Sequence, residues 1–366
     1  MQGSTRKNFR RVVLLTTVVV IGGAAFVLLP AFGQGHNGPP QKDMNIYQAM
    51  RVEVIEAVIS NLNQRYVFPE KAAAMEKQLR LELKNGDYDD VTSAGKLASV
   101  LSESLQKHSH DKHLGMRYFE KEIPVQSRDA ELQAQTIERQ AEDIRLNYGF
   151  HNVDRLHFNI GYIDLHHFAE SPDVAKRIEA AISLLGDTRA MIIDLRKNGG
   201  GSPDTVALLA SYFHDKRTHL NDIYQREGNV TTEMWTNVNV PGKKYGDARK
   251  LYLLTSKETF SAAEDFAYAM KNNKRATIIG EVTGGGAHPG DIHRLNAHFI
   301  MNVPSGRSIS PITKTDWEVV GVQPDIKVSA DDALDHAQLI ILKDILKTEK
   351  DPMWQDALKE SIAELD

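Results

Sequence analysis

One serine of the chain, Ser261, stands where an apolar strand turns into a helix. The segment Leu251–Leu254 is apolar, a short polar turn follows, and the helical run 262–267 begins directly after the serine. A hydroxyl at such a turn is exposed at a strand end, and the free N–H groups of the helix start point toward whatever it attacks. This arrangement is typical of a serine nucleophile with a backbone oxyanion hole. The spacing Ser261-x-x-Glu264 is equally typical of a helix-capping box, so the segment alone leaves both interpretations open.

Two glycine-rich turns follow other predicted strands. The first begins at Asn198 and continues with three glycines before Ser202 and Pro203 open a helix. It lacks the Gly-Lys-Ser/Thr of a phosphate-binding loop and the spacing of a dinucleotide site, so an oxyanion-hole loop and a plain tight turn are the main interpretations. The second turn contains Gly285, Gly286 and His288. These residues line a substrate cleft or belong to a surface loop.

A serine nucleophile needs a base. Ser/Lys dyads use a lysine, but no lysine occurs between Lys274 and Lys314, so the segment that follows the serine helix carries none. Histidine is therefore the better candidate among the 14 in the chain. His113 stands out because it joins a helical region to a short strand, although a solvated or capping histidine is the simpler alternative. A carboxylate partner would stabilise the imidazolium and raise the pKa of such a histidine above about 6.5.

The run around His113 also suggests a metal site. His108, His110, Asp111 and His113 are suitable zinc ligands. Their order departs from the familiar His-x-His-x-Asp-His pattern, and a helix rather than a strand precedes them. We therefore expect no metal, and no cofactor, in the chemistry of Ser261.

Composition narrows the class of protein. The chain has 366 residues, 41% hydrophobic and 25% charged, as in a soluble globular protein. Its formal net charge of −5 offers no electrostatic case for nucleic-acid binding. The absence of cysteine excludes disulfides, thiolate metal sites and cysteine nucleophiles.

The N-terminus predicts export. Four basic residues between Arg6 and Arg11 precede an apolar run over residues 12–32, and a polar linker rich in glycine and proline follows. This pattern is typical of a signal peptide, and the run is also long enough to anchor the chain in a membrane. With basic residues on the cytoplasmic side, residues from about 44 onward would be periplasmic or otherwise extracytoplasmic.

The remaining chain predicts a helical region followed by an α/β core. Helical spacing marks residues 44–120, and residues 121–154 form a linker with one helix near 130–144. Short apolar strands alternate with helices over 155–332, and helices return over 333–366. The expected strands are 160–165, 190–195, 251–254, 277–280, 294–303 and 308–312, and the expected core helices are 175–185, 204–213 and 262–271.

Together these segments resemble the tail-specific, or C-terminal processing, serine peptidase family in its tricorn-like branch. The same segments resemble the modules of the interphotoreceptor retinoid-binding protein. The matching segments are Asp111-x-His113 and residues 147–165, 194–201, 255–264, 280–286 and 317–325.

The resemblance implies a fold and roles for individual residues. It implies a crotonase-like or ClpP-like α/β core of β-β-α units behind a helical N-terminal domain. Ser261 matches the nucleophile, His113 the general base and Glu318 the acidic residue that orients it. The backbone N–H groups of Gly199, Gly200 and Ala262 match the donors of the family's oxyanion hole.

Two departures from the family pattern change the expected base and the expected mode of substrate recognition. The better-known bacterial members use a lysine after the serine and carry a PDZ domain, whereas the stretch between His113 and Gly161 is too short for one. We therefore expect an exported serine peptidase with a peptide or protein substrate and no PDZ recognition of free C-termini. The alternative is a non-catalytic module that binds an apolar small molecule. The sequence does not predict an oligomeric state.

Overall fold

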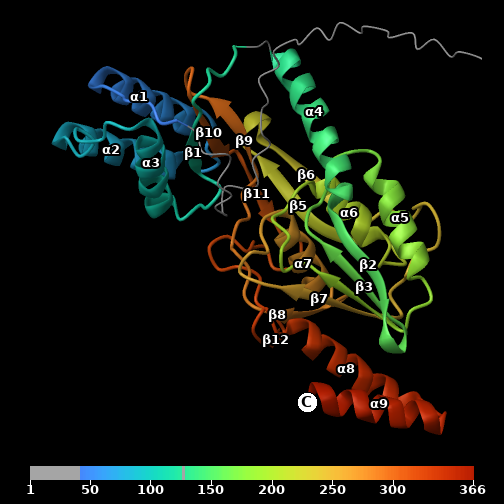
Figure 1. Cartoon of the computed structure of the whole chain (residues 1–366). Helices are drawn as coiled ribbons and strands as arrows, with labels where there is room; N and C mark the ends of the chain where they lie inside the picture. The colour runs from blue at the N-terminus through green and yellow to red at the C-terminus, as the bar shows by residue number, and fades with distance from the viewer. Residues whose placement is uncertain (1–41, 126–127) are drawn as a thin grey trace, which may run out of the picture.

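The computed structural model describes residues 42–125 and 128–366 (Figure 1). The apolar run at 12–32 lies outside these residues, so the expected signal or anchor has no structural counterpart here. Among the described residues, none of the helices combines the length and apolar character that a membrane crossing requires.

A six-stranded sheet forms the centre of the molecule, in the order β12-β8-β7-β4-β3-β2. All neighbouring strands are parallel except β2, which pairs antiparallel with β3. The strands are β2 (Phe150–Leu156), β3 (Ile160–Leu165), β4 (Ala190–Asp194), β7 (Lys250–Thr255), β8 (Thr277–Gly280) and β12 (Ile326–Lys327). Four of them lie where apolar runs predict them, which confirms the α/β core.

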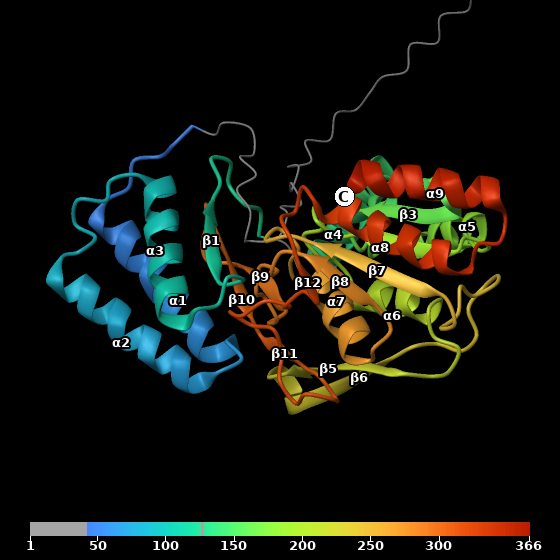
Figure 2. The ribbon, with the colours of Figure 1, turned by 90° about the horizontal axis from the view of Figure 1, so that it is seen from below.

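Helices cover both faces of this sheet because its strands are apolar on both sides. In β4, Ile193 packs toward α5 (Val174–Leu184), α6 (Pro203–Ser211) and α7 (Ala262–Asn272). Its neighbour Ile192 packs toward α8 (Ala333–Thr348), which pairs with α9 (Pro352–Leu365). Figure 2 shows β7 between α8 on one side and helices α6 and α7 on the other.

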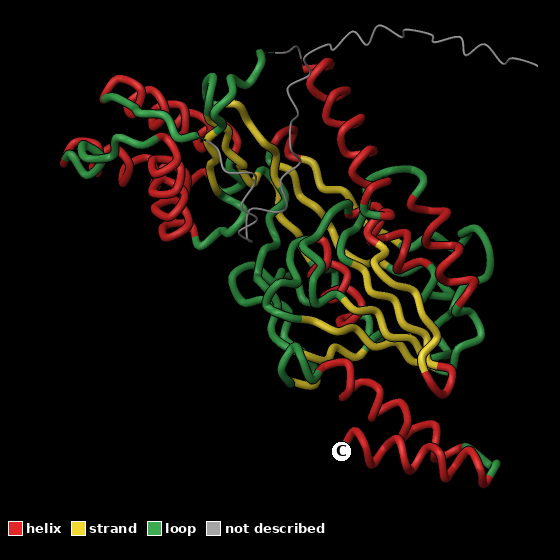
Figure 3. Tube along the Cα trace, viewed as in Figure 1, coloured by secondary structure: helices red, strands yellow, loops and turns green. Residues whose placement is uncertain are grey.

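The helical N-terminal region shares its core with a strand from the other end of the chain. Helices α1 (Gln48–Arg65), α2 (Pro69–Asn85) and α3 (Ala94–Ser109) pack on a sheet of order β1-β10-β9. Its strands are β1 (Gly115–Tyr118), β10 (Phe299–Pro304) and β9 (Gly290–Arg294). Phe299, Met301 and Val303 are buried among the helices, so the two regions are joined through β10 (Figures 1 and 3).

Several elements differ from the sequence prediction. Strand β2 begins inside the segment expected to be a linker, after α4 (Arg128–Arg145). A third sheet, of order β11-β5-β6, contains β5 (His219–Gln225), β6 (Val230–Trp235) and β11 (Gly306–Ile309). Strands β2 and β6 are mostly exposed and polar, so they lack the apolar pattern that marks the buried strands. The strand expected at 294–303 is two strands, β9 and β10, and short 3-10 turns occupy Asn147–Gly149, His157–Asn159 and Glu227–Asn229.

The topology brings distant loops to one edge. Strands β3, β4, β7 and β8 are parallel, so their carboxyl ends lie at the same edge of the sheet. The loops that leave them contain residues 166–168, 195–202, 256–261 and 281–288. Ligand sites of open parallel sheets typically lie at this edge.

We predict that Phe299→Ala destabilises the protein far more than Ile292→Ala. Phe299 is fully buried, whereas Ile292 on the adjacent β9 is 42% exposed. Truncating a buried phenylalanine costs about 3–5 kcal/mol, and an exposed truncation about 0.5 kcal/mol or less. Urea denaturation of both variants measures the difference. Equal losses would mean that the helices do not depend on β10.

Candidate active site

Ser261 occupies a strained turn between β7 and α7. It is the residue before the helix, and its φ of 54° and ψ of −120° fall in a region that non-glycine residues rarely adopt. Such strain is typical of functional sites, and a serine on a sharp strand-to-helix turn is exposed for attack. The capping interpretation holds in part, because the Glu264 carboxylate accepts the Ser261 N–H at 2.9 Å.

Glu264 does more than cap the helix. Its fully buried carboxylate also accepts the N–H groups of Gly285 and Gly286, at 2.6 and 2.9 Å, and the Thr283 hydroxyl at 2.5 Å. Burial raises the pKa of Glu264 to about 7, although the four hydrogen bonds oppose that shift. The Ser261 turn is thus tied to the loop that follows β8.

The glycine turn after β4 lies against the same serine. A Cβ on Gly200 would lie 2.9 Å from Ser261 Cβ, and Gly200 has a φ of +116°, so this close approach requires glycine. Asn198 holds the turn in place: its side chain donates to the Leu165 carbonyl at 2.9 Å and accepts the Gly200 N–H at 2.9 Å.

Two backbone donors remain near Ser261. The N–H groups of Gly199 and Ala262 donate to none of the residues that the structure describes, whereas that of Gly200 is engaged by Asn198. Of the three donors expected for an oxyanion hole, these two are free to donate to a ligand.

His113 enters the site from the helical region. It lies between α3 and β1 and is buried, with its ring 4.7 Å from that of Phe260, the residue before the serine. A Cβ on Gly286 would lie 2.7 Å from His113 Cε1, so glycine is needed there too. Burial lowers the pKa of His113 to about 4, despite the nearby charge of Asp111. The direction is opposite to the upward shift expected from the sequence, because desolvation outweighs the carboxylate.

Glu318 lies beside this histidine in an acidic cluster. Carboxylate oxygens of Asp111 and Glu318 and a ring nitrogen of His113 lie within 4.8 Å of one another. Burial and the charge of Asp111 raise the pKa of Glu318 to about 8. Its Oε2 accepts the Ala287 N–H at 2.5 Å, and its buried Oε1 has no hydrogen-bond partner among the described residues.

His288 belongs to this cluster rather than to a cleft wall. Its Nδ1 is 2.8 Å from Asp111 Oδ2 and 3.5 Å from Glu318 Oε2. Burial is the largest single effect and opposes its charge. The hydrogen bond to Asp111 and the charges of Asp111, Glu318 and Asp316 together outweigh burial and raise the pKa of His288. Tyr66 donates its hydroxyl to the same Asp111 oxygen at 3.2 Å.

A cavity of about 1190 Å³ lies between the Ser261 turn, the glycine turn after β4 and His113. Ser261, His113 and Phe260 line it, together with Gly199, Gly200, Ala262 and Gly286. Gly285 and His288, which the sequence predicts as cleft residues, do not line it. The Gly285 N–H is held on Glu264, and His288 is buried against Asp111.

The hydrogen bonds of a Ser-His-Glu relay are not formed in this structure. Neither ring nitrogen of His113 has a hydrogen-bond partner among the described residues, and its Nδ1 is 4.0 Å from Asp111 Oδ1. Ser261 and His113 both line the cavity, but no hydrogen bond joins them in the part of the chain that the structure describes.

The alternative zinc set does not assemble. His110 ends α3 in a left-handed conformation and is exposed, and His108 lies 4.0 Å from Glu82. Neither belongs to a group of converging metal-ligand side chains in the part of the chain that the structure describes.

Sequence reasoning missed the residues that hold the site together. Asn198 and Glu264 were visible only as turn and cap residues, and Asp111 only as a possible zinc ligand. Their partners come from loops that are far apart in the sequence, so no local pattern marks these contacts.

Models of two protein-family regions match this chain. A model of peptidase family S41 matches residues 159–328, and a model of the N-terminal domain of peptidase S41 in eukaryotic IRBP matches residues 45–146. The chloroplastic carboxyl-terminal-processing peptidase 2 of Arabidopsis thaliana is 32% identical over 175 residues, which cover 45% of this chain and 31% of that protein. The carboxyl-terminal-processing protease of Synechocystis is 33% identical over 169 residues, 46% of this chain and 37% of that protein.

Solved structures show a similar fold. A candidate peptidase from Parabacteroides merdae has a TM-score of 0.56 and 19% identity, covering 80% of this chain and 96% of its own. A lipoprotein from Streptococcus agalactiae has a TM-score of 0.52 and 15% identity, covering 85% and 100%. The chain spans only about a third of the length of the two processing peptidases. Since models of its N-terminal and catalytic regions match in order, the chain belongs to peptidase family S41.

Proposed function

We propose that the protein is a serine peptidase that hydrolyses peptide bonds by acyl transfer. The observation that carries this proposal is the strained Ser261 turn, which shares one cavity with His113 and with the free N–H groups of Gly199 and Ala262. A nucleophile, a neutral base and two oxyanion donors are the parts that acyl transfer requires.

The geometry supports a specific division of roles. His113 takes the proton of the Ser261 hydroxyl as its oxygen attacks the substrate carbonyl, and the two N–H groups stabilise the resulting oxyanion. The imidazolium then protonates the leaving amine, and water releases the acyl group by the reverse sequence. A pKa near 4 leaves His113 neutral at physiological pH, as a base must be.

Glu318 is the proposed partner of the imidazolium. Its unpartnered Oε1 lies in the same cluster as His113, and the carboxylate would stabilise the positive ring formed during the reaction. Asp111 is bound by His288 and Tyr66, so its charge is already partly neutralised.

The cavity lining favours a peptide over an apolar ligand. Charged side chains line it, among them Arg139, Asp143, Lys197 and Asp204. Pockets for apolar small molecules are lined mainly by hydrophobic residues. The non-catalytic binding module that the sequence left open therefore has less support.

We expect Ser261→Ala to abolish peptide hydrolysis and labelling by a fluorophosphonate probe. Loss of a nucleophile lowers the rate by orders of magnitude, whereas loss of a cap costs about 1 kcal/mol of stability. Ser202→Ala, which removes a hydroxyl from the same cavity, is the control and should still be labelled. Mass mapping of the label to a residue other than Ser261 would refute the assignment.

We expect the turnover rate to rise as the pH increases through about 8. Glu318, with its pKa raised to about 8, is neutral below that pH and charged above it. Only the charged form stabilises the imidazolium, and each pKa unit of stabilisation is worth about tenfold in rate. Glu318→Gln should lose this alkaline rise, whereas Glu281→Gln should keep it. Identical pH profiles for the wild type and Glu318→Gln would contradict the role of Glu318.

The N-terminal segment suggests where the peptidase acts. We propose that residues 12–32 deliver the chain across the cytoplasmic membrane, so that residues from about 44 onward meet extracytoplasmic peptides or proteins. N-terminal sequencing and cell fractionation test this. A new N-terminus near residue 33 indicates a cleaved signal, an intact chain in the membrane fraction indicates an anchor, and an intact chain in the cytosol would refute export.

A further inference from the structure

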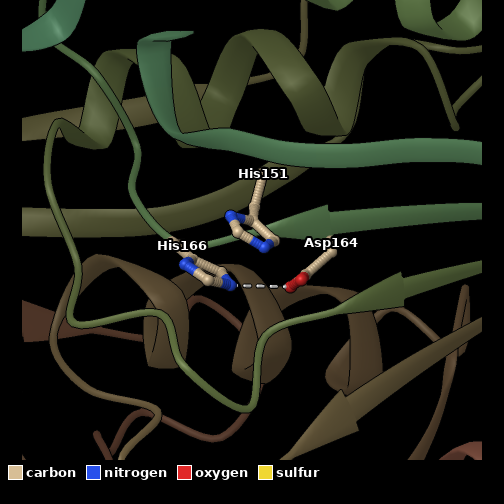
Figure 4. A group of neighbouring side chains, drawn as sticks. All are labelled: His151, Asp164 and His166. Atoms are coloured by element: carbon tan, nitrogen blue, oxygen red, sulfur yellow. Dashed lines mark ion pairs between the residues drawn. The ribbon is translucent and has the colours of Figure 1, made fainter. Parts of the chain in front are cut away.

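The same cavity contains a second group of titratable side chains, outside the proposed triad. His151, Asp164 and His166 converge at the carboxyl edge of the sheet, and both histidines line the cavity. Figure 4 shows the two imidazoles one above the other with the Asp164 carboxylate beside them. One ligand atom from each residue lies within 4.8 Å of the others.

A β-bulge brings His151 into this group. Phe150 pairs with Leu165 and Asn152 pairs with Asp164, so His151 is an extra residue in β2 without a counterpart in β3. Bulges re-aim side chains and are frequent near functional sites. Here the re-aimed ring stacks on that of His166, with a centroid distance of 4.5 Å and an interplanar angle of 8°.

The contact between His166 and Asp164 is close but is not a hydrogen bond. His166 Nε2 lies 3.0 Å from Asp164 Oδ1, yet this buried nitrogen has no hydrogen-bond partner among the described residues. Nor does Asp164 pair with a lysine or arginine in the part of the chain that the structure describes. A ring nitrogen and a carboxylate oxygen thus lie close together, and no lysine or arginine pairs with the carboxylate among the described residues.

We propose that His151, Asp164 and His166 bind a divalent transition-metal ion, with zinc as the first candidate. Two imidazoles and one carboxylate are a known donor set for zinc, with further coordination positions left open. Those positions would face the cavity, because both histidines line it. Imidazole ligands favour zinc and its neighbours over magnesium or calcium.

A tilt of one imidazole ring would bring the three ligand atoms around one ion. With zinc–nitrogen bonds of about 2.0–2.1 Å, two ligands of a tetrahedral ion lie about 3.3 Å apart. The distance of 3.0 Å between Asp164 Oδ1 and His166 Nε2 is already close to this spacing. The stacked rings must lose their parallel arrangement for both to point at one ion, and His151, the exposed member, is the ring free to tilt.

Titration of the metal-free full chain with Co²⁺, followed by competition with Zn²⁺, tests the proposal. We expect one ion per chain and visible absorption bands typical of nitrogen and oxygen ligands. His151→Ala, His166→Ala and Asp164→Asn should each weaken binding by at least about tenfold. His157→Ala removes an exposed histidine from the other end of the same hairpin and should leave binding unchanged.

The outcomes separate this site from the proposed catalytic one. Undiminished binding in the three variants, or no binding at millimolar metal, would overturn the proposal. Loss of binding only in His113→Ala would place the ion at the cluster of Asp111, His113 and Glu318 instead. Because His151 is exposed, its removal should preserve the fold, and fluorophosphonate labelling of Ser261 reports independently whether the catalytic site is intact in each variant.

Discussion

The buried carboxylate of Glu264 is the contact on which the site depends. It joins the backbone of Ser261 to Thr283, Gly285 and Gly286 through four hydrogen bonds. Removing the carboxylate would leave several buried donors unpaired, at about 1–3 kcal/mol each. The loop it holds also carries Ala287, whose N–H reaches Glu318. One side chain therefore fixes both the turn of the proposed nucleophile and the loop behind the proposed base.

Burial sets the charge state of the proposed relay. It lowers the pKa of His113 to about 4 and raises that of Glu318 to about 8, so both groups are neutral around pH 6. A neutral histidine suits a base, whereas a neutral glutamic acid gives the imidazolium little stabilisation. In the proposed mechanism the resting histidine is therefore neutral, and the imidazolium gains the support of a charged Glu318 only when that group ionises.

The two halves of the proposed site come from different parts of the fold. Ser261 follows a strand of the central sheet, whereas His113 leaves the helical region next to β1. Strand β10 connects them: its apolar residues pack among α1–α3, and Asn302 donates its side-chain N–H to the His113 carbonyl at 2.8 Å. The position of the base relative to the nucleophile therefore depends on the packing between β10 and the helices.

Local patterns in the sequence are sufficient to predict the apolar strands and the regular helices of the core. The runs at 160–165, 190–195, 251–254 and 277–280 predict buried strands, and the Ser261-x-x-Glu264 spacing predicts the start of α7, because these signals arise between near neighbours in the chain. Strands β2 and β6 carry no such signal, since their exposed residues need not alternate.

Tertiary structure alone decided the chemistry of the individual groups. The downward pKa shift of His113 reflects its burial against Phe260 and Gly286, and the pairing of His288 with Asp111 joins residues 177 positions apart. Likewise, His151 meets His166 only because a bulge shifts the register of β2 against β3. Desolvation and contacts between distant segments arise only when the chain is folded, so a pattern of residue types predicts the candidates but not their charge or their partners.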